Sequence, residues 1–217
     1  MQASPIINDK THDPFIIFGG LFSRKEVTSL IDSYRNEKFE NTFQEAIELK
    51  KFIINTKISE ERLRHKIAKN LLSGVLSHLP KNSQGDIFYQ DVVVEVKNYP
   101  DDLDVETITG SIKNKALNRK ETAVEELFRY LGDGSKNKWG VLTTGRVYRL
   151  YHFSSSDQYI EFDLFDILDS GSINHFLLLK ALLMDSELRN DLFEKTKKIR
   201  EIQARNSLFS QLEKVLI

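Results

Sequence analysis

Two carboxylates and a lysine lie close together in the stretch GDIFYQDVVVEVK, residues 85–97. Side chains two residues apart in a strand point to the same face, so Glu95 and Lys97 should project together, away from the neighbouring valines. Asp86 begins the preceding short strand, and a tight hairpin would bring its carboxylate beside that of Glu95. Converging carboxylates repel each other unless a cation lies between them. A hard divalent ion is the cation that suits such a site of oxygen ligands.

This combination of groups meets the needs of phosphodiester hydrolysis. A divalent ion activates water, and Lys97 on the same face would hold that water or neutralise a phosphate. The structural alternative is that Glu95 and Lys97 sit at the end of a strand and pair with each other or with solvent. The pattern E-x-K is very common, so the dipeptide alone does not decide between these interpretations.

The elements that must position these residues alternate between helical and strand periodicity. Apolar residues at helical spacing predict a helix over residues 59–79, and two strands then meet at a tight turn near Gln90 and Asp91. The later predicted elements are a helix within residues 116–132, strands at 139–144, 146–153 and 159–164, and an entirely helical region from Ser172. This order predicts a mixed α/β core with extra helices at both ends.

The hairpin pattern D86-x8-E95-V-K97 resembles the PD-(D/E)xK nuclease superfamily, in which a helix precedes the hairpin and a helix and further strands follow it. Gly85, rather than proline, precedes Asp86 here. A second stretch, VEELFRYLGDGSKNKWGVLTTGRVYRLYHF followed by YIEFDLFDIL, resembles the nuclease region of type IIG and related type I-like restriction-modification enzymes. The resemblance covers residues 55–170.

The resemblance implies a restriction-endonuclease-like α/β core, with a mixed central sheet flanked by helices and with helical N- and C-terminal extensions. It divides the chain into an N-terminal arm with helices (1–54), a nuclease core (55–170) and a helical tail or connector (171–217). Within the segment 187–217, apolar side chains recur about every 3.5 positions. This spacing indicates an amphipathic helix or helix pair that could contact another chain.

The implied activity is that of a Mg²⁺-dependent DNA endonuclease, with Mn²⁺ as a substitute metal. Asp86 and Glu95 would hold the metal, with the backbone carbonyl of Val96 as a third ligand. Lys97 would position the attacking water or help to deprotonate it. The rival interpretation is a non-catalytic DNA- or partner-binding module on the same fold, with a degenerate site.

Two further acidic residues correspond to positions that matter in these relatives. A glutamine often supports the site from the helix after the E-x-K strand, and Glu126 stands there in this chain. Glu126 could orient a water, add to metal binding or weaken the site. The relatives also carry an acidic residue on the first core helix, where Glu61 or Glu60 would serve, although acidic residues in a first turn also stabilise the helix dipole.

The implied partners are double-stranded DNA and a methyltransferase or specificity region, either in the same longer chain or in trans. A single site cuts one strand, so cleavage of both strands implies either a second copy, as in a homodimer, or a partner. Basic residues between Thr107 and Lys120 could contact DNA phosphates or lie in a solvated segment: Lys113, Lys115, Arg119 and Lys120.

Composition excludes several other classes of protein. The 217 residues contain no cysteine, which rules out disulfides, thiolate zinc sites and cysteine nucleophiles. The net charge of −1 argues neither for nor against a nucleic-acid partner. No apolar run approaches the length of about 18 residues that a membrane span needs, and no signal-peptide pattern opens the chain. We therefore expect a cytoplasmic protein without a membrane partner.

Overall fold

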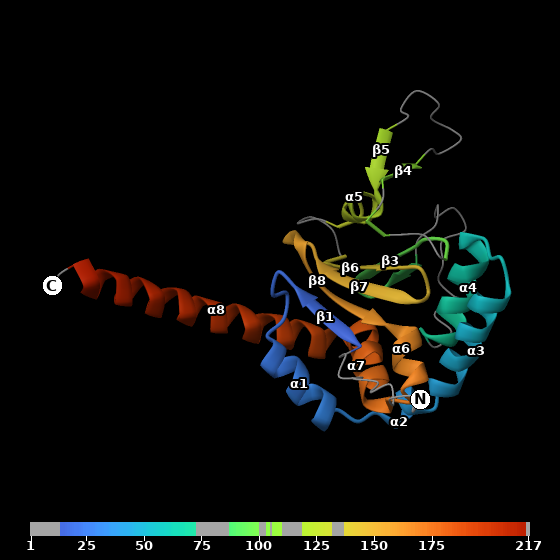
Figure 1. The fold of residues 1–217 in the computed structure, drawn as a ribbon, viewed down its shortest axis with the longest axis horizontal. Helices are drawn as coiled ribbons and strands as arrows, with labels where there is room; N and C mark the ends of the chain where they lie inside the picture. The colour runs from blue at the N-terminus through green and yellow to red at the C-terminus, as the bar shows by residue number, and fades with distance from the viewer. Residues whose placement is uncertain are drawn as a thin grey trace, which may run out of the picture.

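The computed structural model describes residues 14–72, 87–99, 103–104, 106–109, 119–131 and 137–215. Its centre is a six-stranded mixed sheet with the order β1-β8-β7-β6-β3-β2 (Figure 1). The strands are β1 (Phe15–Phe18), β2 (Ile87–Tyr89), β3 (Val92–Val96), β6 (Trp139–Thr143), β7 (Val147–His152) and β8 (Ser155–Asp163). β3 and β6 run parallel, and all the other neighbours in this sheet are antiparallel. A separate two-stranded sheet pairs β4 (Glu106–Thr109) with β5 (Arg119–Thr122).

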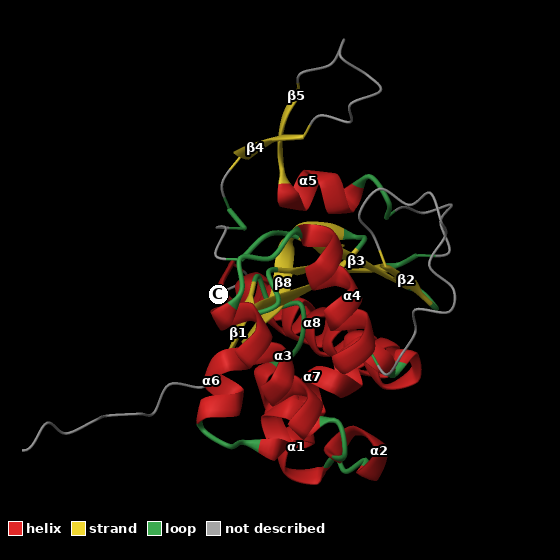
Figure 2. Cartoon of the chain, turned by 90° about the vertical axis from the view of Figure 1, so that its right-hand side faces the viewer, coloured by secondary structure: helices red, strands yellow, loops and turns green. Residues whose placement is uncertain are grey.

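Helices cover both faces of the central sheet, which makes the fold an open α/β arrangement (Figures 1 and 2). The helices are α1 (Arg24–Ser33), α2 (Glu37–Glu40), α3 (Phe43–Asn55), α4 (Glu60–Asn70), α5 (Ala123–Phe128), α6 (Leu164–Asp169), α7 (Ile173–Met184) and α8 (Ser186–Val215). The short helix α5 lies on one face, and α3, α4, α6 and α7 pack on the other.

The alternating residues of β3 divide between the two faces. Val92, Val94 and Val96 belong to the larger hydrophobic core beneath α3, α4 and α7. Val93 instead belongs to a smaller core that it shares with Leu127 of α5. All five residues of β3 are buried, because helices cover the strand on both sides. The strand is therefore central, as its run of valines indicates.

The structure differs from the sequence-based prediction mainly in the extent of the helices. The helix predicted over residues 59–79 is realised as α4, which ends at Asn70, and residues 73–86 lie outside the described part. The helix predicted within residues 116–132 begins only at Ala123, since Arg119–Thr122 forms β5. A capping box formed by Thr122 and Glu125 fixes this start: each side chain bonds the backbone N–H of the other residue.

The larger core draws on all three predicted parts of the chain. Phe15 lies in β1, which adds to the sheet by pairing with Phe162 of β8. Phe176 and Leu178 of α7 are buried against the same core as Val94. The apolar sequence INHFLLLKALLM of α7 suits this position, because a helix that is hydrophobic on nearly all sides needs burial on nearly all sides.

One continuous helix of 30 residues, α8, covers the described part of the segment 187–217, for which the sequence predicts a helix or a helix pair. Its first half packs on the core through Leu192, and its second half projects away from the body of the molecule (Figure 1). Ile202 and Phe209 are 57% and 65% exposed there. In the described part of the chain, no helix combines the length and the apolar character needed to cross a membrane.

Candidate functional site

The predicted pair Glu95 and Lys97 lies on the face of β3 that α5 covers. Glu95 is almost fully buried, at 3% exposure, and the Lys97 side chain is 11% exposed. Both residues extend the line begun by Val93, which packs against α5, while the even-numbered valines enter the other core. The shared face predicted from the strand period is thus present in the structure.

Lys97 binds two carboxylates at once. Its Nζ donates a hydrogen bond to Glu95 Oε1 at 2.7 Å and another to Glu126 Oε2 on α5. The carboxylate of Glu126 also lies 3.6 Å from the Arg129 guanidinium, one turn later on the same helix. We refer to Glu95, Lys97 and Glu126 as the acid–lysine cluster. Two elements that are distant in sequence, β3 and α5, meet in it.

Burial and the two carboxylates act on the pKa of Lys97 in opposite directions. Burial disfavours the charged ammonium, but attraction and hydrogen bonding to Glu95 and Glu126 outweigh it and raise the pKa of Lys97 above its ordinary value. Lys97 therefore keeps its proton at neutral pH. This favours the predicted positioning role over the predicted role in deprotonating water, because a proton acceptor must first be neutral.

A second ionic group continues from the cluster across the sheet. The pairing register places Glu95 opposite Leu142, Leu142 opposite Arg149, and Arg149 opposite Glu161, so all four share the α5 face. Arg149 donates through Nε to Glu161 and through Nη2 to Asp104 at 2.9 Å. Arg146 is three residues before Arg149, and a spacing of three along a strand places two side chains on opposite faces.

Arg146 does lie elsewhere. Its guanidinium pairs with Asp163 at 2.8 Å and sits over the ring of Phe165, 5.6 Å from the centroid. Phe165 belongs to α6 and the larger core. Arg149 is therefore the arginine of this hairpin that shares a face with Glu95.

Of the remaining predicted site residues, Val96 and Glu61 lie in the described part of the chain and Asp86 does not. Asp86 lies outside the described residues, so its closeness to Glu95 stays a prediction; the adjacent register pairs Ile87 with Val94. Val96 occupies its predicted place at the end of β3, with its side chain in the larger core. Glu61 is exposed in the first turn of α4, and the ion pairs of Lys97 go to Glu95 and Glu126 instead.

The predicted DNA-contacting residues are only partly described. Arg119 and Lys120 lie in β5, while Lys113 and Lys115 fall outside the described residues. Within the described ranges, no group of three or more carboxylate or imidazole side chains could hold a metal ion. Asp86, the predicted second carboxylate ligand, lies outside those ranges, so its role stays a prediction.

The chemistry of the cluster is compatible with a hard cation. Two carboxylates, from Glu95 and Glu126, already converge on one positive group, the ammonium of Lys97. Carboxylate oxygens are the ligands that Mg²⁺ prefers in proteins, usually one or two per ion. Glu95, deeply buried at the end of a rigid central strand, is the member best placed to hold such an ion.

The sequence pointed to Glu126 only because it occupies the position of a supporting glutamine in the resembled enzymes. It did not predict the hydrogen bond between Glu126 and Lys97, or the ionic contacts of Arg149 with Asp104 and Glu161. The available signal for Glu126 was the Thr122–Glu125 capping box, which sets the helix start and turns the next residue inward.

Comparisons with family models, with curated proteins and with solved structures gave no significant match.

Proposed function

We propose that this chain is a Mg²⁺-dependent DNA endonuclease domain of the restriction-modification type, with a restriction-endonuclease-like core. The observation that carries the proposal is the acid–lysine cluster: a buried Glu95 and Lys97, two residues apart, lie on one face of a central strand. The order α4, β2–β3 hairpin, α5 and β6 agrees with the order of elements in the superfamily that the sequence resembles.

The proposed roles follow from the contacts of each residue. Glu95 would hold the metal together with Asp86, which requires the β2–β3 register to continue one residue beyond the Ile87–Val94 pair. The backbone carbonyl of Val96 would be a third ligand. When bound, Mg²⁺ supplies a water of lowered pKa and neutralises charge on the phosphate, and Mn²⁺ would substitute for it.

Lys97 would remain protonated and orient the attacking water toward the phosphorus. The water oxygen then forms a bond to phosphorus and releases a proton to solvent, while the bond from phosphorus to one sugar oxygen breaks and that oxygen takes up a proton from solvent, which leaves a cut strand. Glu126 would hold the ammonium of Lys97 in place from α5. A fixed ammonium beside a developing negative charge needs no reorganisation during the reaction, which is the source of electrostatic catalysis.

The proposal includes double-stranded DNA as substrate and a cytoplasmic location, where such DNA would be met. A methyltransferase or specificity region, in the same longer chain or in trans, would supply sequence recognition. Cleavage of both strands would need a second copy of the site, and a homodimer would provide it.

The decisive experiment is cleavage of supercoiled plasmid with Mg²⁺, with Mn²⁺ and with EDTA. We expect metal-dependent nicking by the wild-type chain, and a loss of at least about 100-fold in Lys97→Ala and in Glu95→Gln. Lys198→Ala, on the exposed surface of α8, is the matched control and should cut normally. Metal-dependent activity that survives in both cluster variants would remove the basis of the proposal.

A second candidate is a binding module on the same fold with a lapsed site. The bond between Lys97 and Glu126 favours it, because a lysine engaged by two carboxylates is less available to a phosphate. The variant Glu126→Gln separates the two candidates, since it places at this position the residue that the resembled enzymes often carry. If the site has lapsed, neither the wild-type chain nor Glu126→Gln should bind Mn²⁺ in a calorimetric titration. If the site is active, the wild-type chain should bind Mn²⁺, and Asp86→Asn should bind it more weakly.

A further inference from the structure

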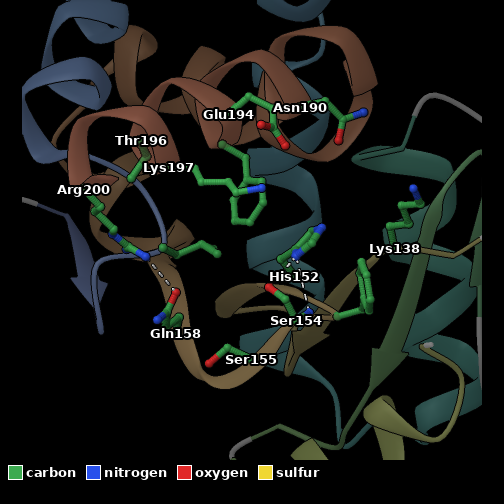
Figure 3. A pocket seen from close by; sticks show the side chains of 13 residues that line it. Lys138, His152, Ser154, Ser155, Gln158, Asn190, Glu194, Thr196, Lys197 and Arg200 are labelled. Carbon is green, nitrogen blue, oxygen red and sulfur yellow. Dashed lines mark hydrogen bonds between the residues drawn. The ribbon is translucent and has the colours of Figure 1, made fainter. Parts of the chain in front are cut away.

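A pocket of about 650 Å³ lies between α8 and the turn that joins β7 to β8 (Figure 3). His152 lines it from the end of β7, Ser154 from the turn, and Asn190 and Lys197 from the helix. Its volume falls within the range typical of small-molecule sites. It lies beside Trp139 at the start of β6, whereas Glu95 pairs with Leu142 near the end of that strand and faces α5.

The charges around this pocket do not cancel. Lys138, Lys197 and Arg200 line it together with a single carboxylate, that of Glu194. Among the described residues, neither Lys138 nor Lys197 forms an ion pair, in contrast to Lys97. Three cations against one carboxylate leave a net positive charge, which attracts an anion.

Three neutral polar side chains of the pocket each accept a hydrogen bond through their oxygen atom. The Trp139 indole N–H donates to Asn190 Oδ1 at 2.9 Å, and Arg200 donates to Gln158 Oε1 at 3.3 Å. A backbone N–H donates to Ser155 Oγ at 3.3 Å. The amide NH₂ groups of Asn190 and Gln158 and the hydroxyl hydrogen of Ser155 remain as donors that a ligand could use.

His152 fits the same pattern. Its Nδ1 lies 2.7 Å from the Ser154 hydroxyl oxygen and 3.3 Å from the Ser154 backbone nitrogen, so this ring nitrogen is engaged by the β7–β8 turn. Burial, with a further contribution from the positive charges of Lys138 and Lys197, lowers the pKa of His152 to about 4, although Glu194 opposes this. At neutral pH the ring is therefore an uncharged member of a pocket rich in donors.

We propose that this pocket binds a phosphate monoester, as carried by a nucleotide or by the phosphorylated end of a nucleic-acid strand. A phosphate monoester presents three acceptor oxygens and up to two negative charges, which match the donors and the net positive charge of the pocket. Phe153 and Phe193, which also line it, offer apolar surface for the rest of the ligand. The proposal does not depend on the proposed nuclease function.

The chain provides its own probe for this site. Trp139 is the single tryptophan, and its ring centroid lies 4.8 Å from that of His152 in the pocket wall. Titration of the whole chain with adenosine 5′-monophosphate, without divalent metal, should change its tryptophan fluorescence in a saturable way. Adenosine should have no effect, and inorganic phosphate should bind more weakly, because it lacks the apolar part.

Charge variants test which residues are responsible. Lys197→Gln and Lys138→Gln should each weaken binding of the nucleotide about tenfold, as expected for a lost charged hydrogen bond. Glu194→Gln should tighten binding about threefold, because it removes the opposing charge. Lys198→Gln is the matched control on the same helix but outside the pocket, and it should bind as wild type does.

Two further arms define the source of the phosphate and the result that overturns the proposal. Tighter binding of a 5′-phosphorylated oligonucleotide than of its 5′-hydroxyl form would assign the site to strand ends, and preference for the free nucleotide would assign it to small ligands. Absence of a saturable response to any phosphate at about 10 mM, or equal binding by adenosine, overturns the proposal. So does unchanged affinity in Lys197→Gln and Lys138→Gln, with folding verified by circular dichroism.

Discussion

Two lysines buried on opposite faces of the sheet show how strongly the surroundings determine the state of one residue type. Lys97 lies beneath α5 and binds Glu95 and Glu126, which hold the pKa of Lys97 above its ordinary value against the effect of burial. Lys180 of α7 is fully buried in the larger core, where its Nζ donates to the Leu71 carbonyl and lies 5.2 Å from the Phe39 ring centroid. Burial lowers the pKa of Lys180 to about 8.

The comparison teaches that burial alone does not indicate a reactive site. Lys180 binds the carbonyl of Leu71 at the end of α4, and the effect of burial on its pKa exceeds that of the Glu45 carboxylate. Lys97 is surrounded by carboxylates that would repel each other without it. Buried carboxylates gathered around a cation are therefore the feature that distinguishes the proposed site from the structural lysine.

The largest expected effect is that of Lys97→Met, which would leave Glu95 and Glu126 facing each other without their cation. Removing one partner from a buried ionic group destabilises the fold by about 3–5 kcal/mol. Chemical denaturation at pH 7 without metal measures this loss. The double variant Lys97→Met with Glu95→Gln should recover most of the stability, and failure to recover it would show that the carboxylates do not depend on Lys97.

A somewhat smaller effect on stability is expected from His152, whose pKa is lowered by burial and by the nearby charges of Lys138 and Lys197. The folded-state pKa of about 4 lies below the ordinary value of 6.5, so the unfolded chain binds more protons between these values. Stability should therefore fall as the pH drops from 6.5 to 4, by up to about 3 kcal/mol. Urea denaturation across this range measures the slope. His152→Gln should flatten it, and an equal slope in that variant would contradict the assignment.

Lys180→Met should have the opposite sign to Lys97→Met and a smaller size. Because the folded-state pKa of Lys180 lies below the ordinary value of 10.5, wild-type stability should rise as the pH increases from about 8 to 10.5. At pH 7 the substitution removes a buried charge together with its hydrogen bond to the Leu71 carbonyl, for a net gain of about 2 kcal/mol. Thermal unfolding at pH 7 and pH 10 measures it. A clear loss of stability would mean that Lys180 resembles Lys97.

The features predicted from sequence are those that depend on local period. The alternation along VVVEVK placed Glu95 and Lys97 on one face, and the apolar spacing placed α4 and the later strands. The contacts that complete the site join residues far apart in the chain: Lys97 and Glu126 are 29 positions apart, and Asp104 and Arg149 are 45 apart. Such contacts depend on how whole helices and strands pack against each other. The spacing of residues along the sequence does not predict this packing.

Other differences arose where tertiary context overrode a local pattern. The apolar run FIIF of β1 gave no sign of its partner, since an edge strand is defined by the strand it pairs with. Lys180 looks from the sequence like the polar side of a helix, yet it is buried because α7 is enclosed on nearly all sides. Thr122 and Glu125 form a local signal that correctly marks where α5 begins.

The most direct test of the proposed site is the position of a metal relative to Asp86 and Glu95. Crystals soaked in Mn²⁺ should show an anomalous peak about 2.0–2.4 Å from a carboxylate oxygen of each residue, with the Lys97 ammonium nearby. Aspartyl oxygens ordered more than about 8 Å from those of Glu95, beyond the reach of one bridging ion, would contradict the account.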